Sequence, residues 1–302
     1  MSTPPLNLQL NGHRGQASGT YSPEAAYSIL QQYLLPDEED EGLSLETAFR
    51  SLNGMAYFPE PPTKNPAFET PRERSLRKSH SVVMDMSHLL IHVARQIPYH
   101  HPAQDKLVKL IVRLSQSKHF IFTGSFTGHT RMAYLMEELA EQNYHIFPLD
   151  NSRCCSTSRQ LVNTRALNLS AFSARLQSAG LDSSFPSDIL WAMSEFEEEL
   201  DADANYDPAL LSARIIAAST WILFAGDYNY RAVVLAPALV TPDLERIHRG
   251  GGLYTGPVLG LERWMFWVRR LDEVSRLAGV SGEAHERGQE AVGVMKALAE
   301  SG

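Results

Sequence analysis

Asp85, His88 and His92 are spaced three and four residues apart, which places their side chains on one face of a helix. Side chains arranged in this way could bind a divalent metal, form the polar side of a ligand pocket, or complete a structural network of hydrogen bonds. The surrounding sequence is apolar, so we favour the structural network first, the pocket second and the metal last. In a pocket, an Asp or His beside apolar groups has a tunable pKa and can act as a general acid or base.

Tyr228 and Tyr230 follow a long apolar stretch in the sequence "AGDYNYR". We predict that Gly226 ends a helix in a left-handed conformation and that Asp227 and Asn229 form the turn after it. Loops that leave a buried helix often carry binding residues, which makes Tyr228 a candidate catalytic residue. Packing of both tyrosine rings is the simpler alternative, and we weigh it as the more frequent outcome.

A pocket for a hydrophobic molecule would be lined by aromatic and methionine side chains with a few polar groups. We therefore predict substrate contacts from residues spread over much of the chain: Met84, Trp221, Tyr230, Tyr254, Trp264 and Trp267.

The segment Gly250 to Gly256 suggests a phosphate-binding loop at first sight, but no Lys-Ser or Lys-Thr follows it. We predict a flexible link or lid that leads into a packing helix. On a helical projection, Arg263 falls on a charged face, opposite an apolar stripe. That stripe contains Leu261, Trp264, Met265, Val268 and Leu271, with Trp267 at its margin.

Motifs for bound cofactors are absent from the sequence: there is no glycine-rich dinucleotide fingerprint, no nucleotide-binding loop and no nucleophile elbow. We therefore expect no cofactor and no metal. The net charge of −8 argues against a nucleic-acid partner, because phosphate contacts require clustered Lys and Arg. The acidic run from Asp37 to Glu41 is interpreted as a solvated loop.

Two adjacent cysteines, Cys154 and Cys155, match no disulfide or zinc pattern and are interpreted as reduced thiols. The N-terminus lacks a signal-peptide core, and no stretch elsewhere approaches the roughly 18 to 20 apolar residues of a membrane span. We therefore expect a cytoplasmic protein without a membrane span, and the sequence leaves its oligomeric state open.

Helical periodicity dominates the chain, and no window shows several alternating strands, so we predict an all-α fold. We expect a single globular domain of about ten helices over residues 21–302, not a regular solenoid. Residues 1–20 lack periodicity and are expected to be poorly ordered. Two packed halves meeting near 145–160 are an alternative organisation of the same domain. Predicted helices include 76–97, 159–178, 187–200, 208–226, 259–278 and 282–300.

Three blocks of the sequence, "IPYHHPAQDKLVKLI", "LNLSAFSARL" and "LYTGP…LERWMFWVRRL", resemble a fungal family known as domain of unknown function number three-six-three-two. The matching positions are Ile97 to Leu107, Asn168 to Leu176 and Gly256 to Trp267. The resemblance implies a filamentous-fungal origin, an all-helical fold and an association with natural-product pathways. It implies no catalytic residue.

Two functions of different class agree with these features. The first is a cofactor-independent enzyme of fungal secondary metabolism that shapes a hydrophobic small molecule in an apolar pocket, as a cyclase, isomerase or pericyclase such as a Diels-Alderase. Its catalytic groups would come from Asp85, His88, His92 and Tyr228. The second is a non-catalytic helical adaptor or ligand-binding protein, which an exposed apolar patch would favour.

Overall fold

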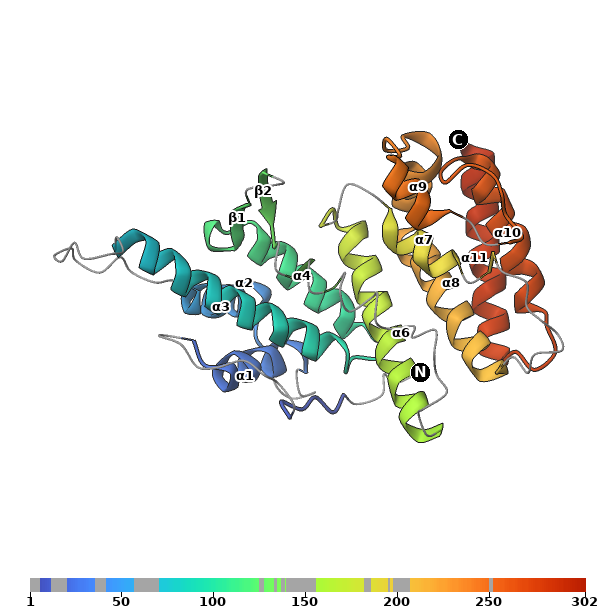
Figure 1. Cartoon of the computed structure of the whole chain (residues 1–302). Helices are drawn as coiled ribbons and strands as arrows, with labels where there is room; N and C mark the ends of the chain where they lie inside the picture. The colour runs from blue at the N-terminus through green and yellow to red at the C-terminus, as the bar shows by residue number, and fades with distance from the viewer. Residues whose placement is uncertain are drawn as a thin grey trace. The chain divides into compact units, whose positions relative to one another are not determined.

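The computed structural model describes residues 6–11, 21–35, 42–56, 71–124, 128–132, 135–136, 139, 156–181, 186–194, 196–197, 207–249 and 252–302. The predicted all-α fold is confirmed, since helices make up nearly all of the regular structure in these ranges (Figure 1). The chain divides into two compact units, Met1–Tyr144 and His145–Gly302. The acidic run from Asp37 to Glu41 and both cysteines lie outside the described residues.

The first unit contains four helices, a short 3-10 turn and one hairpin within its described ranges. These are α1 (Pro23–Leu34), α2 (Leu45–Met55), α3 (Pro71–Ala94), α4 (Ala103–Ser115), η1 (Lys118–Phe120), β1 (Ile121–Gly124) and β2 (Gly128–Arg131). Helix α1 packs against α2, α3 and α4, and α2 also packs against α4. The two strands are antiparallel, with Ile121 opposite Arg131 and Gly124 opposite Gly128.

Serine side chains cap the N-termini of α1 and α2. The Ser22 hydroxyl accepts a hydrogen bond from the Ala25 N–H, and Pro23 occupies the first turn of α1. The Ser44 hydroxyl accepts from the Thr47 N–H in the same way. Each cap satisfies a backbone donor that the first helical turn leaves without a partner, which fixes where the helix begins.

Part of the N-terminal stretch is anchored, although its sequence suggested poor order. Residues 6–11 are extended, Leu8 is buried, and the Gln9 N–H donates to the Gln96 side chain just beyond α3. Residues 1–5 and 12–20 lie outside the described ranges.

The second unit is built around one long helix. Its elements are α6 (Ser156–Ser178), α7 (Ser187–Ser194), α8 (Pro208–Tyr230), the π-helical turn η2 (Arg231–Leu235), α9 (Pro242–His248), α10 (Leu261–Ser275) and α11 (Gly282–Ser301). Helix α8 packs against α6, α7, α10 and α11, so the predicted helix 208–226 forms the buried centre of this unit. Helix α9 was not predicted, and α7 ends before the predicted residue 200.

Close packing of α10 on α11 depends on Gly288. A Cβ atom at this position would lie 2.7 Å from the Ser275 Cβ, closer than two carbon atoms can approach. The glycine therefore sets how near the two helices lie.

The prediction that Gly226 ends α8 is wrong. The helix continues to Tyr230, so Tyr228 and Tyr230 lie on a helix and not on a loop. A Cβ atom on Gly226 would contact Val294 and Leu298 of α11, both at 3.4 Å, so this glycine serves helix packing rather than a left-handed turn. The backbone irregularity falls one residue earlier, at Ala225 (φ −135°, ψ 23°), and the Asn229 side-chain amide donates to the Trp221 carbonyl across it at 3.2 Å.

One helical stretch, Pro208–Leu235, is long and apolar enough to cross a membrane, with a mean hydropathy of 1.6 in its most apolar window. The prediction that no stretch approaches the length of a membrane span is therefore wrong. Of that window, 72% is buried inside the protein. Packing against the neighbouring helices accounts for its apolar side chains, so the stretch is only weak evidence for a membrane span.

Candidate functional site

The predicted site residues lie in both units of the chain. Helix α3 in the first unit carries four of them: Met84, Asp85, His88 and His92. The second unit carries the other six: Trp221, Tyr228, Tyr230, Tyr254, Trp264 and Trp267. We describe the two groups separately.

Asp85 and His88 are half-buried on α3. Burial raises the pKa of the Asp85 carboxyl above its ordinary value, and the nearby His88 partly opposes this shift in pKa. A carboxyl group whose pKa is raised in this way is easier to protonate, so it can exchange a proton closer to neutral pH.

Tyr21 belongs to the same group, although the sequence did not indicate it. Its side chain is 1% exposed, and its hydroxyl finds no hydrogen-bond partner among the described residues. Burial raises the pKa of the hydroxyl first, and the charges of Asp85 and Glu24 add to the increase in pKa. The hydroxyl therefore stays protonated and remains a donor. Buried hydroxyls are rarely left without a partner, so this donor needs an explanation.

The sequence did hold a signal for the burial of Tyr21. The residue directly precedes Ser22, the N-cap of α1, and this is the position where an apolar side chain packs back against the first turn of a helix. Tyr21 directly follows residues 1–20, which were expected to be poorly ordered, and it was not predicted as a site residue.

His92 has a different environment from Asp85. Its Nε2 atom lies 2.8 Å from the Gln9 carbonyl oxygen of the N-terminal segment. Met84 is 39% exposed on the same helix. No group of three or more His, Cys, Asp or Glu side chains in the described ranges could hold a metal ion together. The metal alternative for Asp85, His88 and His92 therefore has no geometrical support.

The aromatic residues of the second unit pack mainly against protein. Trp264 and Trp267 are 0% exposed, and the Trp264 indole N–H donates to the Met295 carbonyl at 3.1 Å. The Tyr230 ring meets Trp264 edge-on at 5.1 Å between centroids. Trp221 is buried on α8, and Tyr228 is half-buried on the same helix. These contacts are those of a well-packed core.

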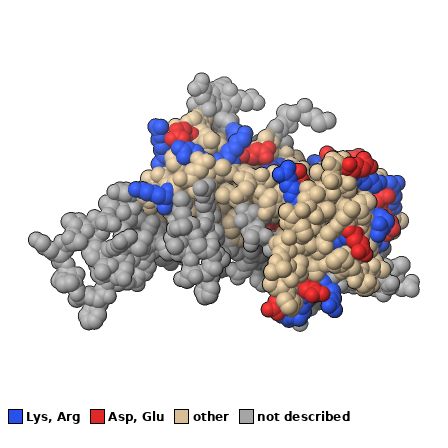
Figure 2. Space-filling view, turned by 90° about the horizontal axis from the view of Figure 1, so that it is seen from above, with Lys and Arg blue, Asp and Glu red and all other residues tan. Residues whose placement is uncertain are grey.

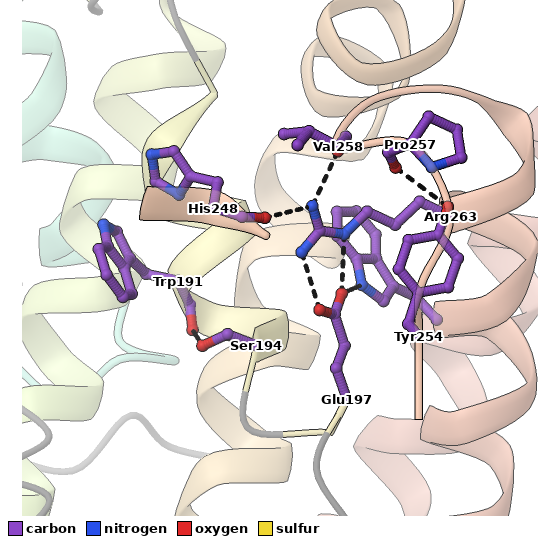
Figure 3. Close-up of polar contacts among 9 residues, drawn as sticks. Trp191, Ser194, Glu197, His248, Tyr254, Pro257, Val258 and Arg263 are labelled. Carbon is purple, nitrogen blue, oxygen red and sulfur yellow. Dashed lines mark hydrogen bonds and ion pairs between the residues drawn. The ribbon is translucent and has the colours of Figure 1, made fainter. Parts of the chain in front are cut away.

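A buried ion pair joins α10 to the segment after α7. The Arg263 Nε and Nη2 atoms donate to the two carboxylate oxygens of Glu197, each at 2.8 Å (Figure 3). Both side chains are almost fully buried, at 1% and 0% exposure. Paired charges in this bidentate geometry satisfy each other where water has no access.

The remaining Arg263 nitrogen, Nη1, donates to two main-chain carbonyls. These belong to His248 at 2.7 Å and Val258 at 2.9 Å, which lie at the two ends of the connection between α9 and α10 (Figure 3). The Trp267 indole N–H donates to the Glu197 carboxylate as well. One arginine therefore ties together a helix, a loop at both its ends and a buried carboxylate.

The predicted surface position of Arg263 is wrong. Arg263 is 1% exposed, whereas Leu261, placed on the apolar stripe, is 49% exposed. Trp267, placed at the margin of the stripe, is completely buried. A helical projection shows which residues share a face, but not which loop covers it. Here Glu197 and the two ends of the α9–α10 connection cover Arg263, while Glu262, Arg269 and Glu273 of the charged face are exposed.

Tyr254 closes this network from the loop. Its hydroxyl donates to the Pro257 carbonyl at 3.0 Å, and its ring packs 5.0 Å from the Phe266 ring. Burial raises the pKa of Tyr254 to about 12, with the Glu262 charge adding to it. A Cβ atom on Gly256 would lie 2.5 Å from the Tyr254 hydroxyl, so a larger residue there would require the Tyr254 side chain to move.

His248 forms the outer edge of the network. Its ring lies 5.2 Å from the Trp191 ring, which is 43% exposed on α7. Burial lowers the pKa of His248, and the positive charge of Arg263 lowers this pKa further. The imidazole is therefore neutral in the folded protein near pH 7.

The two polar groups differ in whether a hydrogen-bond donor is left to bind a ligand. Each donor nitrogen of Arg263 has an acceptor within the protein, so the Glu197 network supports the fold and offers nothing to a ligand. The Tyr21 hydroxyl is unsatisfied and lies near a carboxyl group with a raised pKa. Tyr21, Asp85 and His88 are therefore the candidate site.

The chain was compared with protein families, curated proteins and solved structures. The sequence model of one family, described as "Protein of unknown function (DUF3632)", matches residues 88–271. No curated protein and no solved structure matches the chain.

Proposed function

The chain belongs to the DUF3632 family, and we propose that it is a cofactor-independent enzyme that isomerises or cyclises a hydrophobic small molecule at Tyr21, Asp85 and His88. The observation that carries the proposal is the Tyr21 hydroxyl, a buried donor without a partner in the described part of the chain. The assignment to fungal secondary metabolism rests on the family resemblance alone.

The chemistry of the three groups suits acid–base catalysis on a carbonyl compound. The Tyr21 hydroxyl, whose pKa is raised, can donate a hydrogen bond to a substrate oxygen as negative charge develops on it. Asp85 can take a proton from the adjacent carbon and return it to another carbon, which is favoured by its raised pKa. His88 opposes the rise of the Asp85 pKa, so it favours the carboxylate that is needed before the proton is taken and that forms again after the proton is returned. The sum is an isomerisation that requires no external oxidant or reductant.

The apolar side chains around this group support a hydrophobic substrate. Val82, Val83, Met86 and Leu89 on α3 are buried next to the polar residues in sequence. Such surroundings strengthen hydrogen bonds and favour a pericyclic or cyclising reaction by holding a reactive conformer.

Binding of a phenol tests the proposal directly, because a phenol oxygen mimics an enolate. Purified protein is titrated with the fluorescent probe naphthol, and we expect Tyr21→Phe to weaken binding at least tenfold. Tyr33→Phe is the matched control, since Tyr33 is also a buried residue but its hydroxyl donates to the Lys106 carbonyl at 3.0 Å. Equal binding by the Tyr21→Phe variant and the original protein would contradict the proposal.

Catalysis is measured with a β,γ-unsaturated ketone, whose conjugated isomer absorbs in the ultraviolet. We expect slow conversion by the original protein and at least a hundredfold loss in Asp85→Asn. If biosynthetic genes neighbour the gene of this protein, the late intermediates of that pathway are the natural substrates to test next. A protein that binds naphthol but converts none of these compounds would be a ligand-binding protein and not an enzyme.

An adaptor function is the alternative, and exposed apolar residues on the second unit favour it. Trp191 is 43% exposed, Ile247 47% and Leu239 87%. Figure 2 shows an area of uncharged residues over this unit, bordered by acidic and basic side chains. Such areas are frequent at protein–protein interfaces.

The variant Trp191→Ser separates the two functions. An adaptor would lose a partner that co-purifies with the tagged protein, and its naphthol binding would stay unchanged. If the enzyme proposal is correct, this variant keeps its isomerase rate within about twofold, because Trp191 is not one of the residues of the proposed site.

A further inference from the structure

Residues 6–11, here called the N-terminal strap, are bound to the end of α3 through the main chain of Gln9. The Gln9 N–H donates to the Gln96 Oε1 atom at 2.7 Å, and the Gln9 carbonyl accepts from the Gln96 Nε2 atom at 2.9 Å. The His92 Nε2 atom lies 2.8 Å from the same carbonyl oxygen. Because a carbonyl can only accept, the imidazole is the donor in this contact.

The Gln96 amide is oriented by α3 itself. Its Nε2 atom also donates to the His92 carbonyl at 3.0 Å, four residues back along the chain. This bond turns the amide so that its oxygen meets the Gln9 N–H and its nitrogen meets the Gln9 carbonyl. Gln96 and His92 therefore form one attachment point for the main chain of the strap.

The attachment point lies on the face of α3 that carries the candidate site. Asp85, His88 and His92 follow one another at spacings of three and four residues, so their side chains form a row along one face of the helix. The strap is bound at the His92 end of this row. Tyr21, further along the same chain, lies near the Asp85 end, where burial and then the charge of Asp85 raise its pKa.

The strap can leave α3 without unfolding the helix. Among the described residues, its hydrogen bonds all involve the main chain of Gln9. Leu8 is buried, and Leu6 and Leu10 are half-buried. Segments with few buried contacts open at a low cost in free energy, and the parts of a protein that move when a ligand binds are of this kind.

We infer that the N-terminal strap controls access to the candidate site, and that Gln96 and His92 are positioning residues that hold the strap closed. A ligand enters when the strap is released from α3 and is retained when the strap binds again. The inference rests on the proposed function, because it names what regulates that same site. It gives His92 a role outside the chemistry, since its imidazole binds a main-chain carbonyl of the strap.

The kinetics of naphthol binding to the full-length chain test this inference. Gln96→Ala removes both bonds to Gln9, and we expect naphthol to associate and dissociate about tenfold faster, because a closed strap slows both steps. Gln96→Glu keeps an acceptor for the Gln9 N–H but loses the donor to its carbonyl, so its rates should be intermediate. Stopped-flow fluorescence measures both rates.

Gln32→Ala is the matched control. The Gln32 amide also donates within the first unit, to the Ser28 hydroxyl at 3.2 Å, but on the exposed side of α1. Both naphthol rates of this variant should equal those of the original protein. Circular dichroism and the urea midpoint are measured for every variant, because a merely structural role of Gln96 would lower the midpoint without speeding association.

Hydrogen exchange gives a second measurement, at the strap itself. Ligand binding and strap closure are linked, so a ligand that the closed strap retains must favour the closed state. We expect exchange of the Gln9 N–H to slow about fivefold when naphthol saturates the original protein. In Gln96→Ala the same N–H should exchange fast with or without naphthol.

Failure of the strap and failure of the proposed function give different results. If the original protein does not bind naphthol, or if Tyr21→Phe binds it equally well, the proposed function fails and the strap inference fails with it. If Tyr21→Phe weakens binding but Gln96→Ala leaves both rates unchanged, or if naphthol does not slow exchange at Gln9, the strap inference alone is overturned. Faster rates in Gln96→Ala together with slower exchange at Gln9 on binding support it.

Discussion

The Glu197–Arg263 pair and the Tyr21–Asp85–His88 group are both polar groups in apolar surroundings. They differ in how completely their donors are hydrogen-bonded. Arg263 donates to a carboxylate and two carbonyls, with all of these bonds at 2.7 to 2.9 Å. The Tyr21 hydroxyl has no partner among the described residues. A satisfied buried network stabilises the fold, whereas an unsatisfied buried donor costs stability and is retained where something else binds it.

Removal of one member of the buried pair should have the largest effect. Glu197→Ala leaves the Arg263 charge buried without its carboxylate, and we expect a loss of about 3 to 5 kcal/mol in the free energy of unfolding. Urea denaturation followed by circular dichroism measures it. The double variant Glu197→Leu with Arg263→Met should recover part of the loss, because it removes the isolated charge. A loss below about 1 kcal/mol in the single variant would show that the pair is solvated.

Tyr21→Phe should change stability in the opposite direction. Removing a hydroxyl that has no partner relieves an uncompensated burial, and we expect a gain of roughly 1 kcal/mol in the free energy of unfolding. Tyr33→Phe, the matched control, loses a hydrogen bond to the Lys106 carbonyl and should cost roughly 1 kcal/mol. The comparison between the two polar groups fails if both tyrosine variants are destabilised equally.

The pH dependence of stability should report on His248. Its pKa in the folded protein lies below the ordinary value of 6.5, mainly because the ring is buried. Between these two pKa values the unfolded chain binds more protons than the folded chain, so stability falls as the pH falls below 6.5. His248→Gln should weaken this dependence while keeping the main-chain bond to Arg263, since that bond uses the carbonyl. Urea midpoints measured from neutral to mildly acidic pH test it.

The smallest effect is expected for an exposed ion pair of the same charge types. Glu245 and Arg249 on the edge of α9 lie 3.6 Å apart, with side chains 56% and 74% exposed. Glu245→Ala should change the free energy of unfolding by less than about 1 kcal/mol, and the change should shrink further at high salt. A change as large as that of Glu197→Ala would mean that burial does not determine the strength of these pairs.

Local signals predicted the elements of this fold better than their contacts. Ser22 and Ser44 begin helices, as serines often do, because a cap depends only on the residues next to it. The role of Gly226 was mistaken, since its contact with α11 is set by a helix roughly seventy residues further along the chain. Packing against distant elements determines the role of such a residue, and the periodicity within one element carries no information about that packing.

The candidate site was predicted only in part for the same reason. Asp85 and His88 were found from their spacing on one helix. Tyr21 was missed because it lies on another element and comes near Asp85 only in the folded chain. Arg263 was identified as charged but placed in solvent, although the structure buries it beneath a loop. Spacing along a sequence finds partners within a helix and does not find partners from other elements.

The two hydrogen bonds from Arg263 to the α9–α10 connection affect how much the length of that connection can vary. One guanidinium nitrogen holds the carbonyls of His248 and Val258, so the two ends of the connection stay together whatever the length of chain between them. The cost of lengthening a closed loop grows only slowly with its length. An insertion after Arg249 should therefore leave α10 in place, which makes this connection a position where related chains can differ in length without any change in the core.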